Sequence, residues 1–299
     1  MTIEKGGPTL LLFAVLVALA LIVVSCAPLQ PASPTGPRGN EATYPVVLAE
    51  DAARRESARA AFTRLRQTGA PTRNGKTVEA SPTDLSLSPI TATIQSLPSN
   101  GGSGVYLPKV GTEAVMNEEE TRESLRRFLK DWREIIGAEP ARLSLVDHTV
   151  QSDGTSVANY DQRAFRFPIR GNYGKLQIRF TADRRILSIF SSCIPEADKL
   201  RSALRVLSAG GGVSARLTAE EATKRLSEND IPSTTPAPST FRLPTGAQVN
   251  PTELVTHVRP SKTRADALEF RVAWEIAVTN GPVKLAYVDA LTGEVIAVE

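Results

Sequence analysis

The side chains that could catalyse a reaction or bind a metal are few in this sequence. It contains two histidines, His148 and His257, and two cysteines, Cys26 and Cys193. A zinc site needs several His, Cys, Asp or Glu ligands, most recognisably in the order His-Glu-x-x-His. Neither histidine is followed directly by a glutamate, as that order requires. We therefore expect two solvated histidines on strands, no metal and no other cofactor.

One catalytic alternative is a pair formed by Cys193 and His148, which both fall on predicted strands of one sheet. A catalytic dyad also needs an oxyanion hole and a third group that orients the base. The sequence shows no Gly-x-Ser-x-Gly motif and no phosphate-binding loop. We expect a protein without catalytic residues, in which Cys193 is a small core residue.

Basic residues are dense between positions 161 and 185, where only Asp161 and Asp183 oppose them. Solvated strand faces are the usual explanation for such a set. The sharper hypothesis is a docking face for an acidic partner or for anionic lipid headgroups. The set consists of Arg163, Arg166, Arg170, Lys175, Arg179, Arg184 and Arg185. As candidate partner-binding residues we take Arg163, Arg166 and Arg179 from it, together with Val295 and Val298 of the last predicted strand.

The N-terminal segment predicts a location outside the cytoplasm. Residues 10–24 form an apolar run of 15 residues, which suits a signal peptide better than a membrane-spanning helix. The run ends at Val23-Val24-Ser25-Cys26, which resembles the lipobox of bacterial lipoproteins. That resemblance implies a signal peptide over 1–25, lipidation of Cys26 and a Pro/Ser-rich tether over 26–48. The alternative is an uncleaved membrane anchor. Both place most of the chain in the cell envelope.

Composition excludes some other classes. The formal net charge is only +3. The length of 299 residues and the hydrophobic content of 41% are enough for the cores of about two ordinary domains. A nucleic-acid partner would require a clustered basic stripe with aromatic residues, which the sequence lacks.

Periodicity predicts an α+β fold of two antiparallel-sheet-plus-helix modules. In the first module, over 117–196, an amphipathic helix over 118–136 precedes four strands. Residues 49–116 lead into it with a helix and a short hairpin of 90–96 with 104–107. A linker over 197–216 connects it to the second module. The four strands are expected at 143–151, 156–165, 175–181 and 186–192.

The second module, over 217–299, begins with a helix that Thr218 and Glu221 cap. Strands are expected at 252–258 and 268–278, the latter with one buried face, and two hairpins follow. Asn280-Gly281 forms the first turn, and Asp289 and Gly293 form the second. Residues 231–249, rich in Pro, Ser and Thr, are expected to form an insert without regular structure.

Both modules resemble parts of metallopeptidase precursors. The end of the chain, with Trp274, Tyr287-Val-Asp-Ala and Thr292-Gly-Glu-Val, resembles a PepSY domain. The first module resembles the fungalysin/thermolysin propeptide domain. It does so through Trp132, Gly137-Ala-Glu-Pro, Tyr160-Asp-Gln, Phe167-Pro-Ile, Gly174-x-Leu-x-Ile and Ile186-Leu-Ser, although Arg184 stands where that family often has Gly.

The resemblance implies a non-catalytic lipoprotein, without the peptidase domain, that binds a secreted metallopeptidase and inhibits it or assists its folding. Two alternatives stay open. One is a structural or ligand-binding envelope module with no peptidase partner. The other is a truncated or split metalloprotease precursor.

Overall fold

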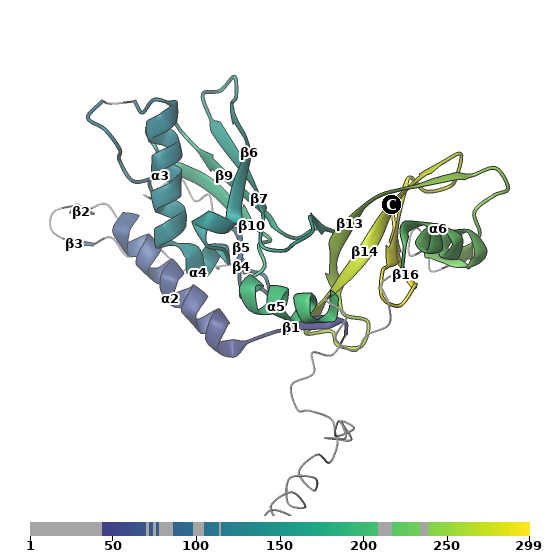
Figure 1. Cartoon of the computed structure of the whole chain (residues 1–299). Helices are drawn as coiled ribbons and strands as arrows, with labels where there is room; N and C mark the ends of the chain where they lie inside the picture. The colour runs from purple at the N-terminus through teal and green to yellow at the C-terminus, as the bar shows by residue number, and fades with distance from the viewer. Residues whose placement is uncertain are drawn as a thin grey trace, which may run out of the picture. The chain divides into compact units, whose positions relative to one another are not determined.

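The computed structural model describes residues 44–69, 72–73, 76–77, 86–97, 105–113, 115–208, 217–233 and 239–299. In this part of the chain, five α-helices accompany several antiparallel sheets (Figure 1). The predicted α+β class is therefore confirmed. The predicted signal peptide, Cys26 and the predicted tether up to residue 43 lie outside the described residues.

The first sheet contains the four strands expected there. They lie in the order β10-β9-β7-β6 and all neighbouring pairs are antiparallel. Tyr160, Leu176 and Ile178 project from it into a core that α3 and α2 cover. The strands are β6 (Leu143–Val150), β7 (Ser156–Gln162), β9 (Lys175–Phe180) and β10 (Ile186–Ser191).

Local sequence explains where the covering helix begins and ends. In α3 (Glu118–Asp131), Asn117 and Glu120 form a reciprocal capping box, and acidic residues fill the first turn, where the helix dipole favours them. After a break at Trp132, α4 (Arg133–Ile136) ends at Gly137, whose φ is 82°. The predicted helix is thus confirmed, as two segments. Figure 1 shows α3 along one face of the first sheet.

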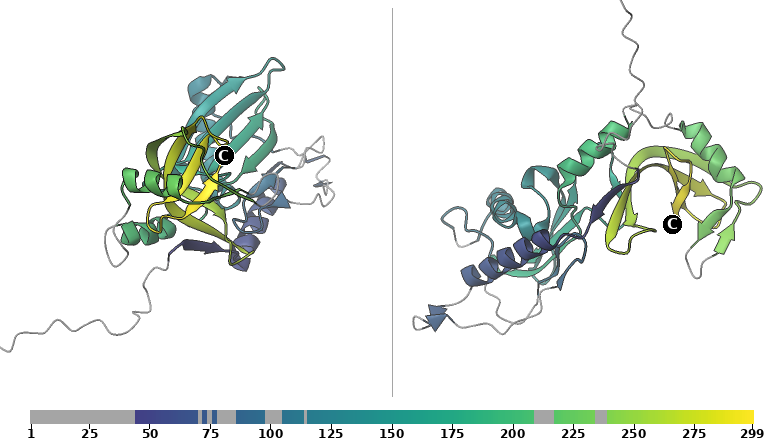
Figure 2. Two further views of the ribbon diagram at one scale, coloured as in Figure 1. Left: turned by 90° about the vertical axis from the view of Figure 1, so that its right-hand side faces the viewer. Right: turned by 90° about the horizontal axis from the view of Figure 1, so that it is seen from below.

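The second sheet has the order β16-β15-β14-β13-β8, and β1 also pairs with β14. Its two long central strands curve strongly in the right-hand view of Figure 2. The hairpin turn at Asn280 (φ 59°) and the turn at Gly293 (φ 76°) are confirmed. The strands are β1 (Val46–Ala49), β8 (Ile169–Arg170), β13 (Gln248–Pro260), β14 (Ala267–Thr279), β15 (Leu285–Asp289) and β16 (Val295–Val298).

Strand β14 is buried on both faces, so the expectation of one buried face is wrong. Phe270 and Ile276 lie in cores on one face. Ala273, on the other face, packs with Val255, Tyr287 and Ile296. The alternation of large and small residues in its sequence therefore reflects two packed surfaces, and not one wet surface.

The expected linker over 197–216 is wrong for its first part, which forms α5 (Ala197–Ser208). Leu200 and Leu204, four residues apart, are buried against the second sheet, and this apolar stripe stabilises the helix. The first module also donates β8, which pairs in parallel with β13. Residues of both predicted modules therefore pack in one core of the second sheet, and both modules belong to one compact unit.

The end of the expected tether is also a strand. Val46 and Leu48 are buried against Phe270 and Leu268, with which they pair in register. Residues 46–48 therefore belong to the fold because they add an antiparallel partner to β14. The chain continues directly into α2 (Ala52–Gly69), which belongs to the core of the first sheet.

Two further expectations are corrected. Residues 90–96 and 104–107 do not form a hairpin. β5 (Ile94–Ser96) pairs with β4 (Ser86–Leu87), and Tyr106 bridges to Arg185. The insert over 231–249 contains β11 (Ile231–Ser233) and β12 (Ser239–Phe241), which pair antiparallel, and Ile231 lies in a core cluster with residues of α6. The remaining elements are β2 (Thr72–Arg73), β3 (Lys76–Thr77), η1 (Pro140–Arg142) and α6 (Ala219–Glu228).

Within the described residues, every helix is too short or too polar to cross a lipid bilayer.

Candidate functional site

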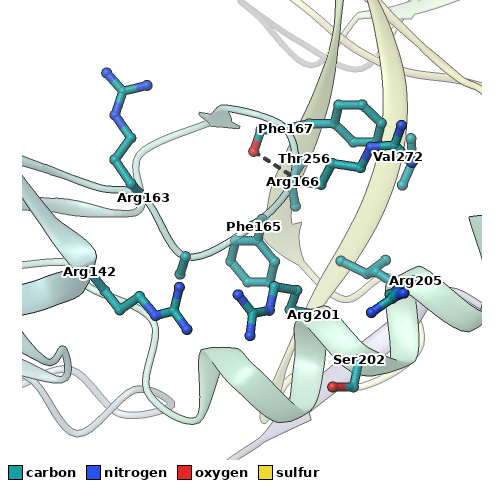
Figure 3. A pocket seen from close by; sticks show the side chains of 12 residues that line it. Arg142, Arg163, Phe165, Arg166, Phe167, Arg201, Ser202, Arg205, Thr256 and Val272 are labelled. Carbon is teal, nitrogen blue, oxygen red and sulfur yellow. Dashed lines mark hydrogen bonds between the residues drawn. The ribbon is translucent and has the colours of Figure 1, made fainter.

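A cavity of about 580 Å³ lies where the β7–β8 loop, α5 and the second sheet meet (Figure 3). Five arginines from three segments of the chain line it, together with two phenylalanines. No lysine or carboxylate is among its lining residues in the described part of the chain. The lining residues are Arg142, Arg163, Ala164, Phe165, Arg166, Phe167, Arg201, Ser202, Leu204, Arg205, Thr256 and Val272. We refer to this cavity as the arginine pocket.

The base of the arginine pocket is apolar and fixed. Ala164, Leu204 and Val272 are almost completely buried. The half-buried Phe165 ring packs 5.8 Å from the ring of Phe270, measured between centroids. A ligand with an apolar group could therefore bury it against a surface that is already ordered.

One carboxylate holds two of the arginines together. Asp198, in the first turn of α5, accepts from Arg142 Nη2 and from Arg201 Nη2 on the same oxygen, Oδ1, at 2.9 Å each. In Figure 3 the two guanidinium groups point toward each other below the Phe165 ring. Asp198 itself lines a neighbouring cavity of about 450 Å³ that shares Arg142.

The two arginines of the β7–β8 loop, Arg163 and Arg166, could bind an anion in the pocket. Among the described residues, neither Arg163 nor Arg166 forms an ion pair with a carboxylate. Arg166 lies over the Phe167 ring, with Cζ 5.3 Å from the ring centroid, a cation–π contact that leaves its donors free. Because guanidinium groups cluster here with one carboxylate in contact, the site attracts anions.

Backbone contacts position this loop. The Arg163 amide donates to the Arg142 carbonyl at 2.7 Å. At the other end of the loop, Thr256 N donates to the Pro168 carbonyl at 2.8 Å, and the Thr256 hydroxyl donates to the Phe167 carbonyl (Figure 3). Residues 163–168 are thereby fastened at one end to η1 and at the other to β13.

The structure brings together only part of the predicted partner-binding set. Arg163 and Arg166 line the arginine pocket. Arg179 lies on β9, where its Nη2 donates to Gln151 Oε1 at 3.4 Å. Val295 is 5% exposed and lies in a core cluster with residues of α6 and β11, and the half-buried Val298 packs against that cluster. Val295 is buried because α6 and β11 cover this part of the sheet.

Three other members of the basic set have structural partners. Arg170 pairs with Glu253 at 2.7 Å and with Glu275. Lys175 pairs with Asp161 at 2.6 Å, and Arg184 Nη1 donates to the Leu107 carbonyl at 3.0 Å. These contacts connect the three side chains to neighbouring segments.

Sequence reasoning missed Arg142, Arg201 and Arg205. The signal for two of them was present, since Arg201 and Arg205 are four residues apart on a helix whose apolar residues follow the same spacing. Treating residues 197–208 as a linker hid this periodicity. Nothing local to Arg142 indicates that it would reach α5.

The Cys193–His148 pair does not form. Cys193 follows β10 and His148 lies on β6, at opposite edges of a four-stranded sheet. Cys193 is fully buried, as expected, and burial raises the pKa of its thiol to about 12. His148 instead stacks on Phe180 with 5.9 Å between the ring centroids.

His257 is 4% exposed, so the expectation of a solvated histidine is wrong for this residue. Its ring lies 4.7 Å from that of Tyr287. Burial, with the nearby Arg259, lowers its pKa to about 4. It remains neutral at pH 7 because its face of the sheet is covered.

The same face carries a buried charge network. Arg271 Nη1 donates to Asp289 Oδ2 at 2.9 Å and to Glu294 Oε2 at 3.1 Å, and Arg271 Nε donates to Glu269 Oε1 at 3.1 Å. Tyr44 donates to Asp289 Oδ2 at 2.6 Å. Since each of these charges has an opposite partner, the network links β14 to β15 and to the chain beyond it. No cluster of three metal-ligating side chains occurs in the part of the chain that the structure describes.

No protein-family model matches the chain, and none of the curated proteins matches it.

Proposed function

We propose that this protein is a non-catalytic binding protein of the cell envelope, and that the arginine pocket receives an acidic segment of a partner protein. The observation that carries the proposal is the convergence of five arginines on one half-apolar cavity. Arginine binds carboxylates through planar, paired donors, and such contacts specify orientation as well as charge.

A secreted metallopeptidase is the partner class that the sequence favours. The two modules follow each other in the sequence in an order that resembles a peptidase propeptide. In such precursors these domains assist folding of the peptidase and occupy its cleft. Binding of this kind requires a complementary surface and no reactive group.

The proposal can be tested with the purified full chain and a secreted thermolysin-type peptidase from the same organism. We expect slower substrate hydrolysis or a higher refolding yield of the peptidase. The double substitution Arg163→Gln with Arg166→Gln should weaken the effect. The matched control is Arg264→Gln, since Arg264 pairs with Asp266 in an exposed turn away from the pocket. Unchanged hydrolysis and unchanged refolding yield would contradict the proposal.

Membrane attachment through Cys26 is part of the same proposal. Replacing this residue by serine removes the only thiol in the lipobox-like segment. We expect the Cys26→Ser protein to leave the membrane fraction. If affinity capture from the envelope yields mainly wall or lipid components, the protein is better described as a ligand-binding envelope module.

A further inference from the structure

The pairing of Asp198 with two pocket arginines indicates what the pocket recognises. This step rests on the proposed function, because it specifies the ligand of the same site. Asp198 has a side chain that is 65% exposed, whereas those of Arg142 and Arg201 are 36% and 41% exposed. An exposed carboxylate thus engages both guanidinium groups at the rim of the pocket.

The geometry of this contact is incomplete. Both arginines donate to Oδ1, so one carboxylate oxygen carries two donors. A ligand carboxylate that entered the pocket could use both of its oxygens, one for each guanidinium, which is the stronger arrangement. Arg163 and Arg166, on the opposite wall, would add charge without losing an existing ion pair.

The apolar base adds a second requirement. Phe165 is fixed against Phe270, and Leu204 and Val272 are buried beside it. A free anion would leave the half-buried Phe165 ring exposed to water, whereas an apolar neighbour of the anionic group would cover it. The pocket is therefore matched to a group that is acidic on one side and apolar on the other.

We infer that the arginine pocket recognises neighbouring acidic and apolar residues of a partner polypeptide, and that Asp198, at the rim, takes up donors of Arg142 and Arg201 in the unbound protein. Asp198 then competes with the ligand and lowers its affinity. A lipid surface fits less well. Membrane-binding patches rely on charges that project toward the bilayer, whereas here the arginines surround a hollow with aromatic walls.

The test measures binding of a fluorescein-labelled alanine-rich peptide with a central Glu-Leu pair to the full chain, by fluorescence anisotropy. Two analogues replace Glu by Gln or Leu by Ser. We expect the Gln analogue to lose about tenfold in affinity, since an interface charge pair is worth roughly that much. The Ser analogue should lose about threefold to tenfold through the lost apolar contact.

Asp198→Asn should bind the Glu-Leu peptide about twofold to fivefold more tightly, because an exposed competing ion pair has been removed. The matched control is Asp266→Asn, which removes an exposed aspartate paired to Arg264 at 2.8 Å and should leave affinity unchanged. Asp198→Glu retains the charge and should not show the gain. Circular dichroism melting confirms that each variant is folded.

The outcomes separate the two claims. Equal or weaker binding by folded Asp198→Asn overturns the competition by Asp198 and leaves the anion site intact. No peptide binding by the wild type or by Asp198→Asn overturns the ligand assignment, whereas the proposed function is decided separately by the peptidase hydrolysis and refolding assay. Binding to phosphatidylglycerol vesicles, but not to phosphatidylcholine vesicles or to the peptide, would replace the polypeptide ligand by a lipid headgroup.

Discussion

The side-chain amide of Gln162 makes a two-way bond with the backbone of Ile194. Its Nε2 donates to the Ile194 carbonyl at 2.9 Å, and its Oε1 accepts from the Ile194 amide at 2.8 Å. The side chain thus satisfies both backbone groups of Ile194 and joins the end of β7 to the segment that precedes α5. Because Arg163 follows Gln162 and Arg201 lies on α5, this contact sets the spacing of two pocket walls.

Substituting Gln162 by alanine should destabilise the protein. Gln162 is 4% exposed, so its removal leaves a buried N–H and a buried C=O of Ile194 without partners. We expect a loss of about 2–4 kcal/mol in the free energy of unfolding, measured by urea denaturation. Gln177→Ala is the control, since Gln177 is exposed and donates to Asn159 at 3.0 Å. Equal stabilities of the two variants would show that the Ile194 contact is dispensable.

Two glycines with similar backbone angles should respond differently to alanine. Gly137 has a φ of 82° and a methyl group there would lie 2.4 Å from Thr93 Cγ2, whereas Gly154 has a φ of 78° and no atom within 4 Å. Gly154→Ala should cost about 1 kcal/mol from the left-handed backbone alone. Gly137→Ala should cost about 2–4 kcal/mol, because overpacking adds to the same strain. Thermal melting measures both, and comparable costs would mean that Thr93 moves aside freely.

Elements set by interactions within a few residues were predicted correctly, whereas contacts between distant parts of the chain were not. Capping residues at Asn117 and Thr218 and the turn residues Asn280 and Gly293 act within a few positions, and the elements they delimit are found where expected. By contrast, the pairing of Val46 with Phe270 joins distant parts of the chain. No local pattern signals such a contact.

The candidate site shows the same division. Arg163 and Arg166 were predicted from charge density along the sequence, and both line the pocket. Arg142 joins them only because η1 and α5 come together in three dimensions through Asp198. Val295 was expected to face a partner, but it lies in a core cluster with residues of α6 and β11. Sequence alone shows which residues carry charge, but packing decides which of them remain exposed.

Stability should fall at acid pH through His257. Its pKa is lowered to about 4 from 6.5 by burial and by Arg259 and Arg271, against the opposite effect of Glu269. Between pH 4 and pH 6.5, His257 is therefore protonated in the unfolded chain and neutral in the folded protein. Full stability is present above pH 6.5 and is lost as pH falls toward 4, by about 3 kcal/mol. Urea titrations at several pH values should show this loss in the wild type and in His148→Gln. The His257→Gln protein should lack it, and an unchanged pH profile in that variant would assign the acid sensitivity elsewhere.

The hydroxyl of Tyr44 should hold β1 on the second sheet. It donates to Asp289 Oδ2 at 2.6 Å, and Asp289 is completely buried, with Arg271 as its other side-chain partner. Burial and the adjacent Asp289 raise the pKa of Tyr44, so the phenol stays protonated and remains a donor. Tyr44→Phe keeps the ring over Arg271 and removes only that bond, which should cost about 1.5–3 kcal/mol because the acceptor is charged.

Amide hydrogen exchange should then become faster in Val46–Ala49 than in β13, since β1 has β14 as its strand partner. Tyr106→Phe, at an exposed position, serves as the control, and matching exchange rates in the two variants would remove Tyr44 as the residue that secures β1.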